Sequence, residues 1–358
     1  MVHPDASPFS SPVVFRHQHL QAFVERVFGA HGLVEEDAQT AAAALVRANL
    51  RGVDSHGVAR VPMYCERLRR GVATAQPTIR IERIARAAAL VDGDNGLGLV
   101  VGRRAMAEAV TMAAESGIGL VGVKRSGHYG MGALYVLQAV DARCIGLAFT
   151  NASRALAVWG GRSPFLGTSP FAAGAPRDQG PPFVLDMACS IVARGKLKFA
   201  AQRGEPIPEG LALDKHGRPT TDGKAAFEGV MQPVGGAKGS GLSMLMDVLS
   251  GVFTGAAFGG DVRNPFTGLD GPQDTGHFFI AIKADLFMPL QVFFDRMRIL
   301  ADRVKSQPLA EGFDEILMPG EPEYRTEQER VERGIPLTAD VVDVLRQEAQ
   351  RAKITFDL

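Results

Sequence analysis

The chain has few of the features that would narrow its function at once. Its three cysteines, Cys65, Cys144 and Cys189, are odd in number and far apart, so we expect neither a disulfide framework nor a zinc site. Its 39 basic residues equal its 39 acidic ones, which leaves no basic field to attract nucleic acid or an anionic membrane. No apolar run approaches the roughly 18 residues of a membrane span. We therefore expect a small molecule as the partner, with no nucleic acid and no membrane.

Signals for export and for metal binding are also missing. Residues 1–12 have neither a basic nor an apolar stretch, so no signal peptide is predicted and we expect a cytoplasmic protein. The eight histidines are scattered, which does not favour a metal centre. The apolar fraction of 46% and the charged fraction of 22% are ordinary for a globular protein, and 358 residues suffice for two or three domains.

Two common enzyme motifs are incomplete. Gly96-Leu97-Gly98 precedes a helical pattern, but Gly102 comes one place too late for a dinucleotide fingerprint, and the next strand ends at Lys124 instead of an acid. We expect these glycines to form a turn and to let the helix pack closely. Ser55 and His56 are adjacent, so on a helix or strand their side chains would point apart, and no G-x-S-x-G elbow is present. A hydrolase triad is therefore not expected.

The apolar pattern predicts an α/β protein with a helical beginning. Strands and helices alternate after the first helices, which indicates a mixed or mostly parallel sheet. Helices are predicted at 17–29, 35–50, 51–71, 98–115, 131–142, 194–203, 242–253, 290–304, 321–332 and 338–351; strands are predicted at 87–91, 118–123, 145–150, 170–175, 183–187 and 278–282, with a short apolar run at 316–318.

The stretch Arg51–Gly71 concentrates side chains that can hold or protonate a small anion. If it is one helix, His56, Arg60 and Tyr64 are four residues apart and share a face beside Ser55. We expect Tyr64 to lie beside the substrate. An apolar stripe on another face would anchor the helix; it comprises Val58, Val61, Cys65 and Leu68. Pro62 would kink this helix.

Two further motifs follow predicted strands. Ser126-Gly127-His128-Tyr129-Gly130 comes where a strand gives way to a helix, a common place for ligands, although a capping serine and a structural histidine would fit as well. Asp186-Met187-Ala188 ends an apolar strand in a carboxylate, which indicates either a functional acid or a helix cap.

Two glycine-rich loops complete the set. Gly235–Gly241 precedes the predicted helix at 242, so its backbone N–H groups and Lys238 could cradle a phosphate. Trp159-Gly160-Gly161, followed by Leu166–Phe171, indicates a loop behind a flat ring or a tight turn with a core tryptophan.

Together these motifs resemble a known family. DSHGVAR with Tyr64, SGHYG, WGG with LGTSP, LDMA, GGAKGSG and MPGE occur in order between residues 51 and 334. The set resembles the malate/L-lactate dehydrogenase type 2 family, which includes ureidoglycolate, sulfolactate and diketogulonate oxidoreductases and piperideine/pyrroline-2-carboxylate reductases. The resemblance implies a homodimeric oxidoreductase that uses NAD or NADP without a Rossmann fold and acts on a small anionic 2-hydroxy or 2-oxo acid, such as malate or lactate.

The resemblance also implies roles for single residues. His56 would donate and accept the proton with Ser55 beside it, Arg60 would hold the substrate carboxylate, and Thr168 would touch the substrate. His128 would be the second candidate for proton transfer. The residues that would line the cofactor are His128, Tyr129, Gly130, Met131, Gly132, Asp186, Met187, Ala188, Gly236, Lys238 and Gly239. Histidine, with a reference pKa of about 6.5, and a bidentate guanidinium suit these roles.

The resemblance further implies a small helical N-terminal region and a large cofactor domain of unusual α/β topology. We expect a helical domain at 1–75 with helices from 320–358 packed on it. A small α/β substrate domain would comprise 76–125 with 285–319, and 126–284 would bind NAD(P).

One position departs from the family pattern. In the cyclic-imine reductases an aspartate follows a motif that aligns with Ala193-Arg194-Gly195, where this chain has Lys196. The missing carboxylate favours a 2-hydroxy or 2-oxo acid over an imine, although Lys196 could be an ordinary helix-surface residue. An NADPH-dependent cyclic imino-acid reductase is the alternative enzyme, and a nucleotide-binding protein without catalysis is the alternative of another class.

Overall fold

The structure is a computed structural model that describes residues 12–358. The prediction about a signal peptide concerned residues 1–12, and all of these except residue 12 lie outside the described residues. Helices α1 (His17–Ala30) and α2 (Glu35–Leu50) form where the sequence predicts them, because their apolar residues recur at helical spacing and face each other across a buried core.

The third predicted helix is wrong as a continuous element. Asp54–His56 and Val58–Arg60 form two 3-10 turns, η1 and η2, and only Val61–Arg69 is an α-helix, α3. Pro62 lies in the first turn of α3, where its missing N–H breaks no hydrogen bond, so it starts the helix without kinking it. The apolar stripe is confirmed, since its four residues are at most 9% exposed.

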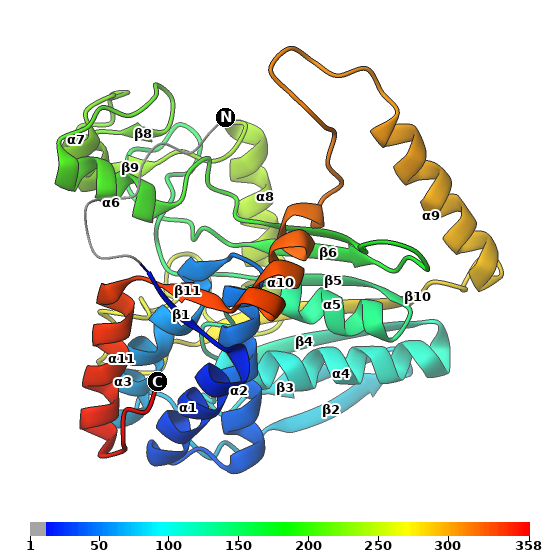
Figure 1. Ribbon diagram of the computed structural model, residues 1–358, viewed down its shortest axis with the longest axis horizontal. Coiled ribbons are helices and arrows are strands. Elements are labelled where there is room, and N and C mark those ends of the chain that lie inside the picture. The colour runs from blue at the N-terminus through cyan, green and yellow to red at the C-terminus, as the bar shows by residue number, and fades with distance from the viewer. Residues whose placement is uncertain (1–11) are drawn as a thin grey trace.

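A seven-stranded sheet runs through the molecule (Figure 1). Only β3 and β4 run parallel to each other, and all other neighbours are antiparallel. The sheet is therefore mixed, and the mostly parallel alternative is wrong. Its strands lie in the order β2 (Arg80–Ala85), β3 (Ala88–Asp92), β4 (Ile118–Ser126), β10 (Thr275–Lys283), β5 (Cys144–Thr150), β6 (Phe171–Ala175) and β7 (Phe183–Met187).

Both faces of the sheet are covered. Helices α4 (Gly98–Ser116) and α5 (Ala133–Asp141) cover one face (Figure 1). The backbone of β4 approaches α4 so closely that a Cβ at Gly119 would lie 2.1 Å from the carbonyl oxygen of Ala109. Three residues on, a Cβ at Gly122 would point to the opposite face, 3.2 Å from Thr254, which follows the π-helical turn η3 (Val248–Val252).

The start of α4 lies directly against the segment that follows β4. A Cβ at Gly98 would lie 2.1 Å from the carbonyl oxygen of Gly127, so only glycine fits there. The prediction that these glycines allow close packing is confirmed, and this contact holds the backbone before His128 in place.

A lobe beyond β7 and an extended helix complete the middle of the chain. The lobe comprises α6 (Arg194–Arg203), β8 (Ala212–Leu213), α7 (Gly223–Glu228), β9 (Val230–Met231) and α8 (Ala237–Asp247). Helix α9 (Leu290–Lys305) points away from the body (Figure 1). The helix predicted at 242–253 is corrected, since α8 begins at Ala237 and gives way to η3.

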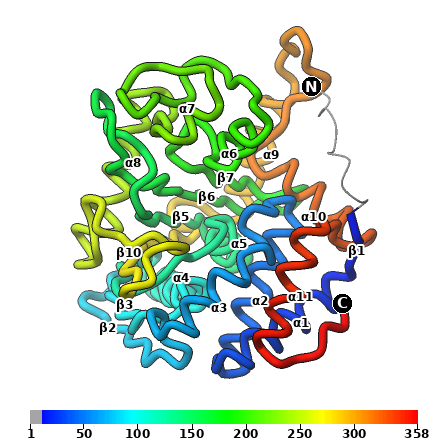
Figure 2. Tube along the Cα trace, turned by 90° about the vertical axis from the view of Figure 1, so that its left-hand side faces the viewer, coloured from blue at the N-terminus to red at the C-terminus, as the bar shows by residue number. Residues whose placement is uncertain are grey.

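The C-terminal segment returns to the N-terminal helices. Strand β11 (Ile335–Leu337) pairs antiparallel with β1 (Val13–Phe15), and α11 (Ala339–Ala352) shares a core with α1 and α3, while α10 (Glu321–Arg333) contacts α2 (Figure 2). The predicted division into domains stays a prediction, and one sheet takes strands from both 76–125 and 126–284.

The short and exposed strands escaped prediction. β1, β8, β9 and β11 have two or three residues each, and β2 is exposed along its whole length, so none carries a period-2 apolar pattern. The run 316–318 is not a strand. Within residues 12–358, no helix combines the length and apolarity needed to cross a bilayer.

Candidate active site

The turns η1 and η2 are shaped by side chains from outside the motif. Asn49 Oδ1 accepts the Val58 N–H at 2.8 Å, and a Cβ at Gly57 would lie 2.1 Å from the same oxygen. Asp54 accepts the Asn49 amide at 2.6 Å and binds Arg330 from α10 at 2.7 Å. These contacts compete with regular helix geometry, which explains why the stretch breaks into two turns.

The break changes the relation between Ser55 and His56. Ser55 Oγ lies 3.0 Å from His56 Nδ1, so the prediction that the two side chains cannot meet is wrong. That prediction assumed a regular helix or strand, whereas η1 is a tight turn. Desolvation and the nearby Arg60 charge lower the pKa of His56 to about 4, so its imidazole is neutral near pH 7.

Arg60 is a cation without a carboxylate. Its Nε donates to the Ser55 carbonyl at 2.6 Å, and the guanidinium carbon lies 4.9 Å from the centre of the Phe266 ring. No acid of residues 12–358 pairs with it, and burial lowers the pKa of its guanidinium. A half-buried arginine with free N–H groups and no counterion is suited to bind an anion.

His128 faces this arginine from the segment after β4. Its Nδ1 lies 3.3 Å from the Gly130 N–H and 2.7 Å from the Tyr64 hydroxyl. A backbone N–H can only donate, so Nδ1 is the acceptor, Tyr64 donates to it, and Nε2 carries the hydrogen. The rings of His128 and His56 stack with centroids 5.7 Å apart and planes 14° apart.

Burial and the charges of His56 and Arg60 lower the pKa of His128 well below its usual value. His128 is therefore a neutral imidazole that presents its Nε2 hydrogen. His56, Arg60, Tyr64 and His128, which the sequence placed in two separate motifs, form one cluster.

Sequence reasoning missed residues that hold this cluster from β10 and the loop before it. Gln273 Oε1 accepts the His128 N–H at 2.9 Å. His277 is buried, stacks on Tyr129 with centroids 4.9 Å apart, and lies 2.9 Å from Ser126 Oγ and 2.8 Å from Thr150 Oγ1. No spacing in the sequence connects residues 273–277 to residues 126–129, so no local signal could have identified them.

Asp186 lies at the N-terminus of α5, next to the same segment. Its Oδ2 accepts the Ala133 N–H at 2.8 Å, and a Cβ at Gly132 would lie 3.0 Å from Oδ1 and 3.1 Å from the Tyr129 hydroxyl. Desolvation raises the pKa of Asp186 to about 6, although the residue keeps an exposed surface. The buried Tyr129 hydroxyl has no hydrogen-bond partner among the described residues. The polar group that this corner offers to a ligand is therefore the Asp186 carboxylate.

The glycine-rich loops and the LDMA motif are joined by backbone hydrogen bonds. Cys189, directly after Ala188, donates its N–H to Thr168 O at 2.8 Å, and its own carbonyl accepts the Val234 N–H at 2.9 Å. Ser243 Oγ in α8 donates to Gly167 O at 3.0 Å. These bonds hold the end of the LDMA motif, the segment at Thr168 and the loop that begins after Val234 next to one another.

Trp159 is exposed and lies over the loop Gly235–Gly241, not in the core. A Cβ at Gly236 would be 3.0 Å from its ring, and Ser240 Oγ accepts the backbone N–H of Trp159 at 3.0 Å. Because α8 begins at Ala237, Lys238 and Gly239 lie in its first turn, and the predicted cradle before residue 242 is corrected to the turn at Gly235 and Gly236. Lys238 and Lys196 are both exposed, and Lys196 lies in the first turn of α6.

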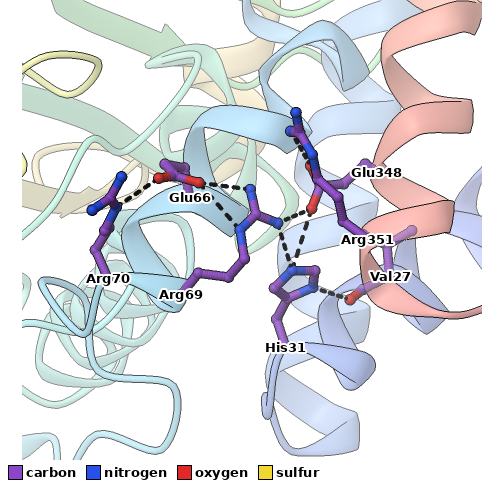
Figure 3. Close-up of polar contacts among 7 residues, drawn as sticks. All are labelled: Val27, His31, Glu66, Arg69, Arg70, Glu348 and Arg351. Carbon is purple, nitrogen blue, oxygen red and sulfur yellow. Dashed lines mark hydrogen bonds and ion pairs between the residues drawn. The ribbon is translucent and has the colours of Figure 1, made fainter.

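A second polar cluster lies on another side of α3 (Figure 3). One ligand atom each from His31, Cys65 and Glu348 lies within 4.8 Å of the others, as a metal site would require. Arg69, however, hydrogen-bonds both Glu348 and His31 Nε2, the latter at 2.9 Å, while His31 Nδ1 donates to Val27 O at 2.8 Å. The guanidinium already supplies the positive charge, so this cluster is an internal ion pair that needs no metal.

Comparisons with known proteins agree with one another. A family model described as malate/L-lactate dehydrogenase matches residues 15–346. The malate dehydrogenase of Pyrococcus abyssi is 38% identical over 94% of both chains, and the NAD(+)-dependent ureidoglycolate dehydrogenase of Escherichia coli K12 is 32% identical over 92% of this chain and 94% of that one. The solved sulfolactate dehydrogenase of Methanocaldococcus jannaschii superposes with a TM-score of 0.91 at 35% identity, over 96% of this chain and 98% of that one.

Proposed function

The chain belongs to the malate/L-lactate dehydrogenase family, and on that premise we propose that it transfers a hydride between NAD or NADP and a small 2-hydroxy or 2-oxo acid. One observation supports this proposal most directly. Arg60, which no carboxylate of the described residues neutralises, lies beside two neutral imidazoles, His56 and His128. A 2-oxo acid has a carboxylate for the arginine and a carbonyl oxygen for the imidazoles.

We assign the two histidines different tasks. His128 Nδ1 already accepts two hydrogen bonds, so it cannot easily take a second proton, and its Nε2–H serves as a neutral donor to the substrate oxygen. Among residues 12–358 the one hydrogen-bond partner of the His56 ring is the Ser55 hydroxyl, which can donate or accept by rotating, so either protonation state of the ring can be satisfied. His56 is therefore the group that moves the proton.

Substrate binding prepares His56 for this task. Desolvation is the larger cause of the low pKa of His56, and electrostatic repulsion by Arg60 is the second. A carboxylate bound to Arg60 neutralises that charge and raises the pKa of His56 toward its usual value. The imidazolium then stabilises the developing alkoxide and protonates it, and the neutral ring removes the proton in the reverse direction.

The residues around the loop Gly235–Gly241 are suited to bind a dinucleotide. Gly235 and Gly236 have φ of +62° and +64°, and the turn they form leads into an eleven-residue helix that has Lys238 in its first turn. Such a turn binds a pyrophosphate through backbone N–H groups. The exposed Trp159 ring beside Gly236 supplies a flat surface, and the exposed Asp186 carboxylate supplies polar atoms. When bound there, the nicotinamide supplies the hydride or accepts it.

A substrate panel tests the proposal. The purified protein is assayed spectrophotometrically with NADH and NADPH against oxaloacetate, pyruvate, sulfopyruvate and cyclic 2-imino acids. We expect turnover of 2-oxo acids. Turnover of the imines alone would establish the reductase alternative, and enhanced nicotinamide fluorescence without turnover of any compound would establish the non-catalytic one. The panel also identifies the accepted substrate and the preferred cofactor.

We also propose that the chain acts as a homodimer. Two exposed apolar surfaces support this: one on α8 and η3, and one on the extended helix α9. Their residues are Leu242, Leu245, Val248, Val252 and Phe253 on the first, and Val292, Ile299 and Leu300 on the second, each at least 36% exposed. Light scattering after size-exclusion chromatography should give twice the 38.2 kDa chain mass, and a monomer at micromolar concentration would contradict the proposal.

A further inference from the structure

The segment Asp261–Asp274, which we call the strap, leads from the lobe to β10 and crosses the candidate site. Near its end, the Gln273 amide oxygen accepts the His128 N–H at 2.9 Å. Near its middle, the Phe266 ring lies on the Arg60 guanidinium at 4.9 Å. One loop therefore contacts both the proposed carboxylate ligand and the proposed donor to the substrate oxygen.

Arg67 fastens the strap to α3. Its side chain is 3% exposed, and it donates to the carbonyl oxygens of Gly268 and Gly271 at 3.0 and 3.3 Å. No carboxylate pairs with it among residues 12–358, and burial, together with Arg263, lowers the pKa of its guanidinium. A buried cation that is committed to two loop carbonyls holds that loop firmly, because releasing it would leave the cation without hydrogen bonds.

The turn that carries Phe266 is fixed from within as well. Asn264 Oδ1 accepts the N–H groups of Phe266 and Thr267 at 2.9 and 3.2 Å, and its carbonyl accepts the Gly268 N–H at 2.9 Å. The aromatic ring is therefore presented by a rigid turn, although 51% of Phe266 is exposed. The turn, and not burial in an apolar core, therefore places the Phe266 ring against the Arg60 cation.

The contacts of Arg60 leave one direction open to a ligand. Its Nε is engaged by the Ser55 carbonyl, and one face of its guanidinium is covered by Phe266. The two terminal nitrogens have no partner among the described residues. A carboxylate can therefore form two parallel hydrogen bonds only at that end, in the plane of the guanidinium.

We propose that Phe266, held by Arg67, is the positioning residue that orients Arg60 and thereby makes the site selective for a substrate carboxylate bound end-on to its terminal nitrogens. The inference rests on the proposed function, since it assumes that Arg60 binds the substrate. Phe266 acts through Arg60 and takes no part in the proton or hydride transfer.

Kinetics of matched variants test this inference. F266L keeps apolar bulk but loses the ring, F266Y keeps the ring, and F258L is the control, because Phe258 is also 51% exposed and does not lie on Arg60. F266L should raise KM for the best 2-oxo acid roughly 3- to 30-fold, the range of a partly desolvated cation–π contact, with kcat and cofactor KM changed less than twofold. F266Y should restore the wild-type KM.

A second readout separates positioning from general loosening. The ratio of kcat/KM for a 2-oxo acid to that for its carboxamide should fall in F266L by the same factor as the KM rises. R67M should show the same loss of selectivity, and R67M/F266L should be no worse than either single variant, since both act on one contact. Additive effects would place Arg67 outside this mechanism.

The outcomes distinguish this inference from the proposed function. A wild-type protein inactive on every 2-oxo acid overturns the proposed function and the inference with it. An active wild type whose acid-to-amide ratio is unchanged in F266L overturns the inference alone. An equal change in F258L would show that exposed phenylalanines in this region matter for another reason, and would also overturn it.

Discussion

Helix α3 and the turns before it carry an arginine cluster on each of two sides. Arg69 faces inward to a buried glutamate, Glu348, and to His31, and Glu66 on the same helix accepts from it at 2.9 Å (Figure 3). Arg60 faces two histidines and an aromatic ring, with no acid paired to it in residues 12–358. In the first cluster the arginine has acidic partners, whereas in the second the arginine has none.

This difference separates a structural cluster from a ligand site. Burial alone would raise the pKa of Glu348, but the hydrogen bond and the positive charge of Arg69 lower it, so these two opposite charges satisfy each other. At the other cluster the pKa values of His56, His128 and Arg60 are all lowered, because each cation would be desolvated without a counterion. A small anion is what the second cluster lacks.

The largest expected effect is on kcat, and it separates His56 of the Arg60 cluster from His31 of the Arg69 cluster. His56→Ala should lower kcat by about 10²- to 10⁴-fold, the usual contribution of a general acid, with little change in cofactor affinity. His31→Ala is the matched control and should leave kcat unchanged while lowering stability. Steady-state kinetics and nicotinamide fluorescence titration measure both. An unaltered rate in His56→Ala would transfer the proton-moving role to His128.

Glu348→Gln should break the Arg69 cluster instead. Removing one partner of a buried ion pair costs about 3–5 kcal/mol, and we expect roughly 2–4 kcal/mol here because the Arg69 side chain is 27% exposed. Urea unfolding measures the loss, and kcat should stay near the wild-type value. Glu329→Gln, which removes an exposed ion pair with Arg333, is the control and should change stability by less than about 1 kcal/mol.

Arg60→Lys should weaken the anion site without destabilising the fold. An ammonium cannot reproduce the two parallel hydrogen bonds of a guanidinium, so KM for the 2-oxo acid should rise roughly 10- to 100-fold. Cofactor KM should stay within twofold. Equal increases in both KM values would place Arg60 outside the substrate site.

The smallest effect concerns stability against pH. The pKa of His56 is about 4 in the folded protein and about 6.5 when unfolded, so the unfolded state binds more protons between these values. Stability should therefore rise with pH across that window and fall on acidification. His56→Gln should flatten this slope, by on the order of 1 kcal/mol after allowing for partial exposure.

Glu348 should act at lower pH in the same direction. Its folded pKa is lowered, so its contribution is present above the usual glutamate value and is lost as the pH falls through the folded pKa. Glu348→Gln should flatten the profile only in that acidic range. Urea midpoints measured from pH 3 to 8 test this difference between the two residues. If His56→Gln and Glu348→Gln changed stability over the same pH range, the prediction would be contradicted.

The sequence by itself determined the chemical groups and most of the regular elements. Helices with a clear apolar period, such as α1, α2 and α4, formed where predicted, because burial of one face decides a helix locally. The order of six motifs identified the family. Local propensity also explains the main error: nothing inside residues 51–71 reveals that Asn49 and Arg330 hold the backbone as two 3-10 turns.

Only the tertiary structure decided which cation is free. Arg60 and Arg69 are nine residues apart and chemically identical, and the local sequence offers only Arg69 an acid at helical spacing, Glu66. The buried acid that pairs with Arg69, Glu348, comes 279 residues later, on α11. The ring that orients Arg60 lies on a strap attached to β10. Electrostatic balance depends on distance and burial, which chain folding sets, so the anion site follows from what the fold leaves unpaired.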